Sequence, residues 1–256
     1  MKLKPQKKAL QISFAVLGVA AACVSASRAA TIYAAGTAAG PSGDAPTLAN
    51  SDNTATEMGS WETWIGGANW VSSGTVQTSV IMGFQLPSLG AVSNPFGTAT
   101  LGVNYFGTDN GPTFNVDLYG LGTRANSTAL GSDYFGGSLD STPGVTLLTD
   151  NIITPSTPHQ NADDPAGTFS SDISLYLNTM YANGANAGQF VMFRFSADVT
   201  GLNSSSDLVY HLETNPGNGT PNDLPQITYT LTAVPEPATV ALLGVAGAAL
   251  LLRKRR

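Results

Sequence analysis

Three tryptophans lie close together in the stretch WETWIGGANW, and they are the only tryptophans of the chain: Trp61, Trp64 and Trp70. Exposed aromatic rings stack on the apolar faces of sugars, and the Glu, Thr and Asn side chains beside them could bind sugar hydroxyls. Core packing is the competing interpretation, because buried aromatic side chains dominate β-sandwich cores. On a strand, Trp61 and Trp64 point to opposite faces. The three tryptophans are therefore candidate glycan contacts that need not share one surface.

Residues suited to catalysis are scarce. His159 lies in the loop-like stretch TPHQNADDP beside Asp163 and Asp164, and His211 lies in the strand-like stretch VYHLET. A serine triad needs a nucleophile beside a base, and no G-x-S-x-G occurs. Two isolated histidines and one cysteine are too few for a zinc ligand set. We therefore predict no catalytic residue, no metal site and no cofactor.

Carboxylates are abundant, and they keep two alternatives open. The chain has 17 Asp and Glu residues, and a glycoside hydrolase or lyase needs only two carboxylates at a suitable separation. The sequence singles out no such pair. Calcium could also bind some of these oxygens, although no EF-hand or nonapeptide spacing is present.

Basic residues are confined almost entirely to the two ends of the chain. Residues 29–252 contain all 17 acidic residues, no lysine and only two arginines, Arg124 and Arg194, a formal charge of −15. Such a body would repel nucleic acid, because neutralising phosphates takes clustered Lys and Arg. Nucleic-acid binding is therefore excluded as a function.

Alternation of apolar and polar residues indicates that the body is built from β-strands. Residues 76–86 read as a half-buried strand, and residues 99–120 read as a β-hairpin whose turn is TDNGP. Further strands are expected at residues 31–34, 62–65, 145–149, 189–198, 208–213 and 226–232. Loops rich in Gly, Asn, Ser, Thr and Pro separate them, as in antiparallel sandwiches.

One segment has helical spacing instead. Ile173, Leu177, Met180 and Tyr181 would share one face of a short helix that begins at Ser171 or Asp172 and ends before Asn183-Gly184. The predicted fold class is mainly β: an antiparallel, jelly-roll-like β-sandwich with one short helix. About 200 residues are enough to bury a two-sheet core without disulfides or metal.

The N-terminal segment has the features of a secretory signal peptide. Four lysines within the first eight residues precede the apolar run ISFAVLGVAAACV, and Ser27 and Ala29 are small residues at the −3 and −1 positions. The predicted cleavage lies between Ala29 and Ala30. A lipoprotein alternative would use Cys23, the only cysteine, but Ala20 stands where a lipobox usually has Leu or Val. Cleavage after Ala29 would leave a mature protein without a thiol.

The C-terminal stretch VPEPATVALLGVAGAALLLRKRR combines a proline-rich start, an apolar run and a basic end. The apolar run is a marginal membrane span, near the lower limit of about 17 residues. The basic residues at both chain ends prefer the cytoplasmic side, so the acidic body is the translocated part. Pro235 and Pro237 keep the segment before the span extended and accessible to a processing enzyme.

Val234, Pro235, Glu236 and Pro237, followed by the apolar segment and the Arg/Lys cluster, resemble the PEP-CTERM sorting signal of exported bacterial proteins. The resemblance implies recognition by an exosortase and removal of the C-terminal helix after transient anchoring in the inner membrane. It also implies delivery to the cell surface or an exopolysaccharide matrix. The competing interpretation is an ordinary membrane tail.

The body resembles DNRLRE-type β-sandwich modules, which are similar to carbohydrate-binding modules. The resemblance rests on segments that occur in the same order: residues 62–67, 80–89, 99–101, 116–120 and 224–229. These are strand positions and not a binding signature. The chain departs from the pattern where an Arg usually precedes one strand, and Gln85 occupies the usual acidic position.

The predicted organisation is therefore a signal peptide (1–29), a β-sandwich domain (30–233) and a sorting signal with a transmembrane helix (234–256). The expected function is that of a non-enzymatic, exported surface or matrix protein associated with glycan. Its expected partners are signal peptidase, exosortase and extracellular polysaccharide. The alternative is a secreted polysaccharide-active enzyme with an unidentified carboxylate pair.

Overall fold

The computed structural model describes residues 29–34, 47–50, 55–57, 62–71, 74–134, 145–160, 171–199, 202, 208–213 and 225–232. Contacts within the chain define two units, and the unit described below is Ala29–Leu231. The other unit combines Met1–Arg28 with Thr232–Arg256. The predicted signal peptide before Ala29 and the predicted sorting helix therefore lie outside the described residues.

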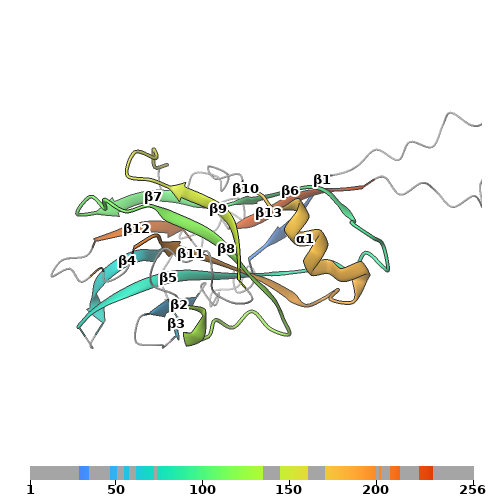
Figure 1. The fold of residues 1–256 in the computed structure, drawn as a ribbon, viewed down its shortest axis with the longest axis horizontal. Helices are drawn as coiled ribbons and strands as arrows, with labels where there is room; N and C mark the ends of the chain where they lie inside the picture. Colours follow the sequence, from blue (N-terminus) through green and yellow to red (C-terminus); the bar gives the residue numbers. More distant parts are fainter. Residues whose placement is uncertain are drawn as a thin grey trace, which may run out of the picture. The chain divides into compact units, whose positions relative to one another are not determined.

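The described strands form two antiparallel sheets, accompanied by one short α-helix (Figure 1). The smaller sheet has four strands in the order β1 (Ala29–Tyr33), β13 (Gln226–Leu231), β6 (Phe96–Gly102) and β10 (Ser171–Asp172). The larger sheet has the order β7 (Asn104–Asp109), β12 (Leu208–Glu213), β4 (Glu62–Val71), β5 (Gly74–Gln85), β11 (Phe190–Ala197), β8 (Val116–Arg124) and β9 (Thr146–Ile153). Two short strands, β2 (Thr47–Asn50) and β3 (Ala55–Glu57), complete it through pairing of β2 with β5 and β3.

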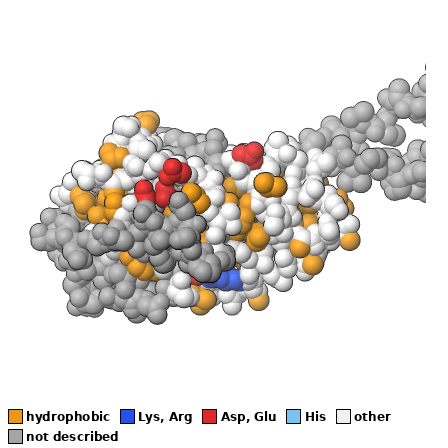
Figure 2. All heavy atoms as spheres, viewed as in Figure 1, with side chains coloured by type: hydrophobic (Ala, Val, Ile, Leu, Met, Phe, Trp, Pro, Cys, Tyr) orange, Lys and Arg blue, Asp and Glu red, His pale blue; other side chains and the backbone are white. Residues whose placement is uncertain are grey.

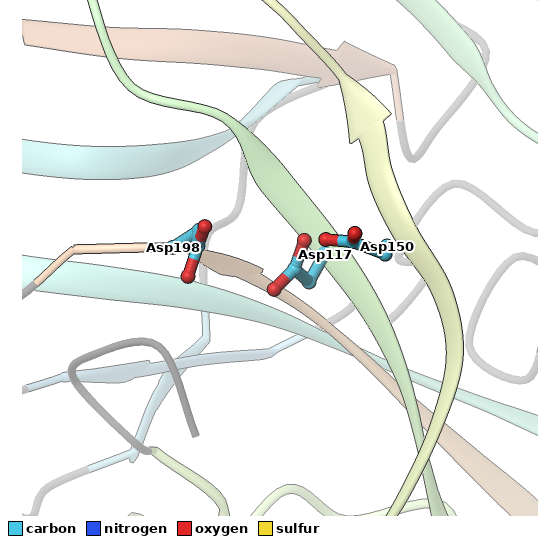
Figure 3. Close-up of side chains that lie close together, drawn as sticks. All are labelled: Asp117, Asp150 and Asp198. Carbon is cyan, nitrogen blue, oxygen red and sulfur yellow. The ribbon is translucent and has the colours of Figure 1, made fainter. Parts of the chain in front are cut away.

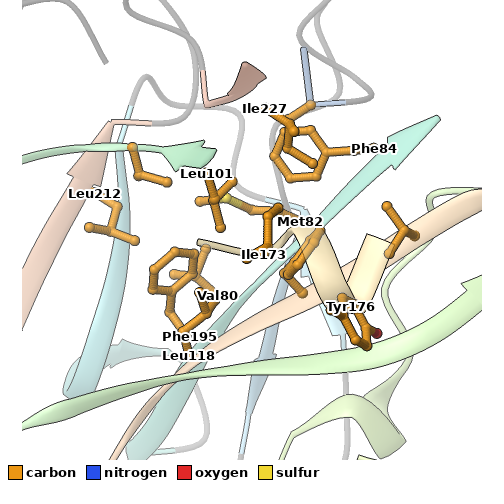
Figure 4. Close-up of a cluster of buried hydrophobic side chains, with 14 of the residues drawn as sticks. Val80, Met82, Phe84, Leu101, Leu118, Ile173, Tyr176, Phe195, Leu212 and Ile227 are labelled. Carbon is orange, nitrogen blue, oxygen red and sulfur yellow. The ribbon is translucent and has the colours of Figure 1, made fainter. Parts of the chain in front are cut away.

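The hydrophobic core lies between the two sheets, as the predicted β-sandwich requires. Alternate residues of β5 and β11, such as Val80, Phe84 and Phe193, are buried in one cluster with Leu101 of β6 and Ile227 of β13 (Figure 4). Burying one such side chain contributes about 1.5–3 kcal/mol. The period-two pattern of the sequence is therefore the pattern of core contacts, and the sandwich-like architecture is confirmed.

The predicted hairpin at residues 99–120 is wrong. Only Val103 separates β6 from β7, and at this point the chain passes from the small sheet to the large one. β7 then pairs with β12, whereas β8 pairs with β11 and β9. Leu101, Val103 and Tyr105 all face the core, so the alternation continues without a break although the pairing partner changes. The turn itself is present, because Asn110 and Gly111 have positive φ angles of 55° and 61°.

The predicted short helix is confirmed as α1 (Ser174–Tyr181), but its predicted start is wrong, because Ser171 and Asp172 form β10 and the N-cap residue is Ile173. Asp172 precedes it, and its carboxylate accepts hydrogen bonds from the Ser174 N–H (3.0 Å) and hydroxyl (2.5 Å), which lower the pKa of Asp172. Helical geometry ends where Ala182, Asn183 and Gly184 take positive φ angles. A short 3₁₀ helix, η2 (Ala182–Gly184), spans this turn, and another, η1 (Gly131–Asp133), follows β8.

Helix α1 continues the edge of the small sheet where β10 ends. After β10 pairs with Leu101 and Thr100, the Ile173 N–H bonds the Ala99 carbonyl at 3.0 Å. The Ser174 hydroxyl accepts the Ala99 N–H, and the Asn178 side chain bonds both the N–H and the C=O of Phe96 at 2.9 Å. Helix side chains thus satisfy edge groups of β6 that would otherwise be open to another strand.

A glycine in β8 makes room for the helix on the large sheet. A Cβ atom at Gly120 would lie 2.2 Å from the Tyr176 ring, so no larger residue fits without displacement. The Tyr176 hydroxyl accepts the Gly122 N–H at 2.7 Å, and burial raises the pKa of Tyr176 to about 12. Tyr176 therefore fixes α1 against β8 as a neutral side chain.

Candidate functional sites

Only one of the three candidate tryptophans can be placed in full. Trp64 lies in β4, partly exposed, and alternates with the fully buried core residue Ile65. Trp70 belongs to the same strand, but its side chain lies outside the described part of the structure, as does Trp61 altogether. The structure therefore leaves untested whether the three rings share a surface, and Trp64 is the residue on which a site can be built.

Trp64 lies in a row of rings that crosses three strands. It is directly paired with His211 of β12, and their ring centroids are 5.4 Å apart with planes tilted by 56°. On the other side of His211, the Phe106 ring of β7 lies at 5.6 Å. Their neighbours Ile65, Tyr210 and Tyr105 belong to the core, so the row faces away from it. We call Trp64, His211 and Phe106 the aromatic row.

A bulge in β7 brings Phe106 into this row. His211 is paired with Gly107 and Leu212 with Tyr105, so Phe106 is the additional residue between the two pairs. Bulges on edge strands re-aim side chains in this way. Phe106 and Gly107 are both partly exposed, and apart from the two chain neighbours of Gly107 no atom lies within 4 Å of the position where a Cβ at Gly107 would stand. The surface beside Phe106 is therefore open.

A carboxylate lies beside His211, the middle ring of the aromatic row. The Asp109 Oδ2 atom is 3.2 Å from the His211 Nε2 atom, and the Asp109 side chain is 46% exposed whereas that of His211 is only 10% exposed. The outer side of the Asp109 carboxylate is thus open to solvent. The arrangement combines partly exposed ring faces with an exposed hydrogen-bond acceptor.

The second histidine lies elsewhere in the chain, in an exposed loop. The His159 ring is 6.3 Å from that of Tyr105, and its Nδ1 atom is 3.1 Å from the Gln160 carbonyl oxygen. Asp163 and Asp164, the acidic residues of the same loop, lie outside the described residues. The proximity of this histidine to those carboxylates stays untested.

Three carboxylates that the sequence did not single out lie close together on β8, on β9 and just after β11. The ligand oxygens of Asp117, Asp150 and Asp198 are all within 4.8 Å of one another (Figure 3). We call these residues the acidic cluster. Such oxygens are the ligands that calcium prefers, and within the described ranges no other His, Cys, Asp and Glu side chains form such a group.

Burial dominates the electrostatics of the acidic cluster. Asp117 is only 2% exposed, and desolvation raises its pKa. Hydrogen bonds from the Asn151 N–H (2.8 Å) and the Tyr119 hydroxyl (3.0 Å) lower it, and the negative charges of Asp198 and Asp150 raise it again. The net direction is upward, so Asp117 holds its proton to a higher pH than an ordinary aspartate.

The two arginines of the acidic body both contact Asp133, the last residue of η1. Arg124 forms a two-pronged ion pair with the Asp133 carboxylate, and the Arg194 Nη1 atom donates to the Asp133 carbonyl oxygen at 3.0 Å. The Arg194 guanidinium is buried 4.6 Å above the Tyr119 ring, where desolvation lowers its pKa. Both cations therefore have structural contacts at Asp133. Among the described residues on the face drawn in Figure 2, only a few side chains are charged.

The bond at which signal-peptide cleavage is predicted, between Ala29 and Ala30, lies in strand β1. Ala29 and Ala30 are the first residues of β1, where they pair with Thr230 and Tyr229 of β13. Val234 to Pro237, the predicted sorting motif, begin three residues after β13 ends but lie outside the described residues. Within the described ranges, no helix has the length and apolar character needed to cross a bilayer.

Comparison with known families decides the nature of the C-terminal segment. Residues 233–256 match the family model of the PEP-CTERM protein-sorting motif. The chain carries a PEP-CTERM sorting signal. This confirms the resemblance seen at Val234–Pro237, and the motif implies an exported, membrane-anchored precursor that an exosortase processes. A search of the curated proteins found no match to the chain. The resemblance of the body to DNRLRE-type modules stays a prediction with which the sandwich-like fold is consistent.

Proposed function

We propose that this protein is a non-enzymatic component of the cell surface or extracellular matrix, exported through its PEP-CTERM signal and associated with glycan. The observation that carries the proposal is the position of the sorting motif. It begins at residue 233, directly after β13 closes the sandwich at Leu231. The folded body is thus followed at once by a segment that acts as an address for export.

The pairing of the first and last strands supports this arrangement. β1 runs antiparallel to β13, with Ala29 opposite Thr230, so the chain enters and leaves the body at neighbouring positions. The two predicted processing steps would thus concern the chain just before β1 and just after β13, which are neighbouring strands.

The alternative function, a polysaccharide-active enzyme, has the acidic cluster in its favour. Glycosidases use neighbouring carboxyl groups, one of which is an acid with a raised pKa, and the cluster has close carboxylates and a raised pKa at Asp117. However, Asp117 is only 2% exposed, and its two oxygens accept hydrogen bonds from Asn151 and Tyr119. A general acid must reach the glycosidic oxygen, so the geometry favours a structural interpretation of this cluster.

Two assays run side by side on the exported protein separate the alternatives. One measures retention of the protein on a panel of polysaccharides, and the other measures reducing sugar released from the same polymers. Retention without release supports the proposed function. Release of sugar by the wild type, abolished in an Asp117→Asn variant, would replace it with the enzymatic one. Neither retention nor release would remove glycan from the proposal and leave a structural surface protein.

A further inference from the structure

The aromatic row offers the two kinds of contact that a sugar chain requires. Trp64 and Phe106 present partly exposed rings on either side of His211, and the exposed carboxylate of Asp109 lies beside them. Ring faces of this kind bind the apolar faces of pyranoses, whereas the carboxylate accepts hydrogen bonds from hydroxyl groups. We infer that the aromatic row and Asp109 form a binding site for an uncharged polysaccharide. The inference rests on the proposed glycan association and names its site.

The spacing of the row suits an extended chain of sugars. Trp64, His211 and Phe106 lie on three adjacent strands, β4, β12 and β7. Neighbouring strands are about 4.7–4.9 Å apart, so the outer rings are separated by about two strand spacings. Two pyranose rings of one chain that are separated by a third sugar could therefore lie across the strands, one over Trp64 and the other over Phe106.

The surface around Phe106 is kept open by the backbone of β7. The bulge places Gly107 opposite His211, and a Cβ atom added to this glycine would meet no other atom within 4 Å. Gly107 has no positive φ angle, so the glycine is not required by the local backbone conformation. A larger side chain at this position would cover the row without straining the strand, which provides a direct steric test.

The charge of the body selects against acidic polysaccharides. The segment 29–252 has a formal charge of −15 and contains only Arg124 and Arg194 as cations. Both arginines contact Asp133, so neither is available to pair with a uronate or sulfate group at the row. The Asp109 carboxylate beside His211 would repel an anion bound at the row. An uncharged polymer is therefore the ligand that the surface fits.

The test is affinity electrophoresis of the exported, processed protein in gels that contain dextran, mannan or hydroxyethylcellulose as neutral probes, with alginate as the anionic probe. We expect at least one neutral polymer to retard the wild type and alginate to have no effect. Trp64→Ala and Phe106→Ala should each weaken retardation by about tenfold or more, as for central aromatic contacts in binding surfaces. Trp64→Phe should be retarded more strongly than Trp64→Ala and less strongly than the wild type.

Two further variants separate a binding role from a structural one. Gly107→Leu should abolish retardation and leave the thermal unfolding curve unchanged, because it fills open space. Tyr33→Ala is the matched control, since Tyr33 is a 40% exposed aromatic residue on β1 of the other sheet, and it should bind like the wild type.

Three outcomes would contradict, in turn, the location of the site, the glycan association and the preference for uncharged ligands. If a neutral polymer retards the wild type and also Trp64→Ala, Phe106→Ala and Gly107→Leu to the same extent, the row is not the site, although glycan association survives. If no polymer retards the wild type, the proposed glycan association fails as well. Stronger retardation by alginate than by the neutral polymers would overturn the preference for uncharged ligands.

Discussion

The aromatic row and the acidic cluster both face away from the core, but they differ in exposure and in charge. In the row, Trp64 and Phe106 are partly exposed, and the Asp109 carboxylate, 3.2 Å from the His211 Nε2 atom, is 46% exposed. The acidic cluster brings three carboxylates together around Asp117, which is nearly fully buried and already hydrogen-bonded. Closeness of acidic groups is therefore weaker support for a site than accessible surface of the right chemistry is.

The substitution of Arg194 should have the largest effect on the free energy of unfolding. It tests whether the strands that carry the acidic cluster have a structural role. Arg194 is 2% exposed, and its guanidinium lies over Tyr119 and bonds the Asp133 carbonyl. Arg194→Ala should lower the free energy of unfolding by about 3 kcal/mol, as expected when a buried charged partner is lost. Urea denaturation measures this, with Arg194→Lys as the control that keeps the charge. A loss below about 1 kcal/mol would show that the loop at Asp133 is held by other contacts.

Replacement of Asp117 by Asn should have a smaller effect on stability, and this effect should depend on pH. Its folded pKa is raised above the ordinary value of 3.8, so ionisation destabilises the folded state. The cost is absent below pH 3.8 and fully present once the pH exceeds the folded pKa. Asp117→Asn should therefore be more stable than the wild type at about pH 7, and the difference should shrink as the pH falls toward about 4.

The Asn side chain can keep both hydrogen bonds of Asp117, since its oxygen can accept the Asn151 N–H and its amide can donate to the Tyr119 hydroxyl. Thermal unfolding at a series of pH values gives the readout, and about 1 kcal/mol corresponds to about 2–4 °C for a body of this size. A wild type that is more stable than Asp117→Asn at neutral pH in metal-free buffer would contradict the raised pKa.

The smallest expected effect is that of divalent cations. With no metal site predicted from the sequence, EDTA or millimolar calcium should shift the melting temperature of the exported protein by no more than about 1 °C. Binding of calcium to the folded state alone would instead stabilise it by about 2.7 kcal/mol at a concentration about 100 times the dissociation constant. A calcium-dependent rise that disappears in Asp117→Asn would reassign the acidic cluster as a cation site.

Much of the fold follows from local patterns, whereas the sites depend on non-local pairing. The strands of residues 208–213 and 226–231 and helix α1 are where alternation and helical spacing placed them. The two-residue strand β10 and the short strands β2 and β3 have no pattern of their own, because their partners define them. The sequence does not reveal that the chain changes sheet at Val103, because alternate residues on both sides of Val103 face the core without interruption.

The candidate sites also depend on contacts between residues that are distant in the sequence. Trp64 could be found from the sequence because tryptophan is rare, but its neighbours His211 and Phe106 are distant in the chain and meet it through strand order. The only local signal for Phe106 was the alternation of β7, and the bulge at this residue breaks that alternation. Likewise, Asp117, Asp150 and Asp198 are three of 17 acidic residues, and nothing in their spacing distinguishes them before the sheet brings them together.

The central claim, that this body is cargo for an exosortase, is tested most directly by the intact mass of the exported protein. In a host that carries an exosortase, the surface-located protein should begin at or within a few residues of Ala30 and should lack residues 238–256. A variant with Pro235, Glu236 and Pro237 changed to alanine should keep its full C-terminus and stay in the inner membrane, because alanine leaves the apolar span intact. Surface-located wild-type protein that retains Arg256, or an alanine variant processed like the wild type, would contradict the claim.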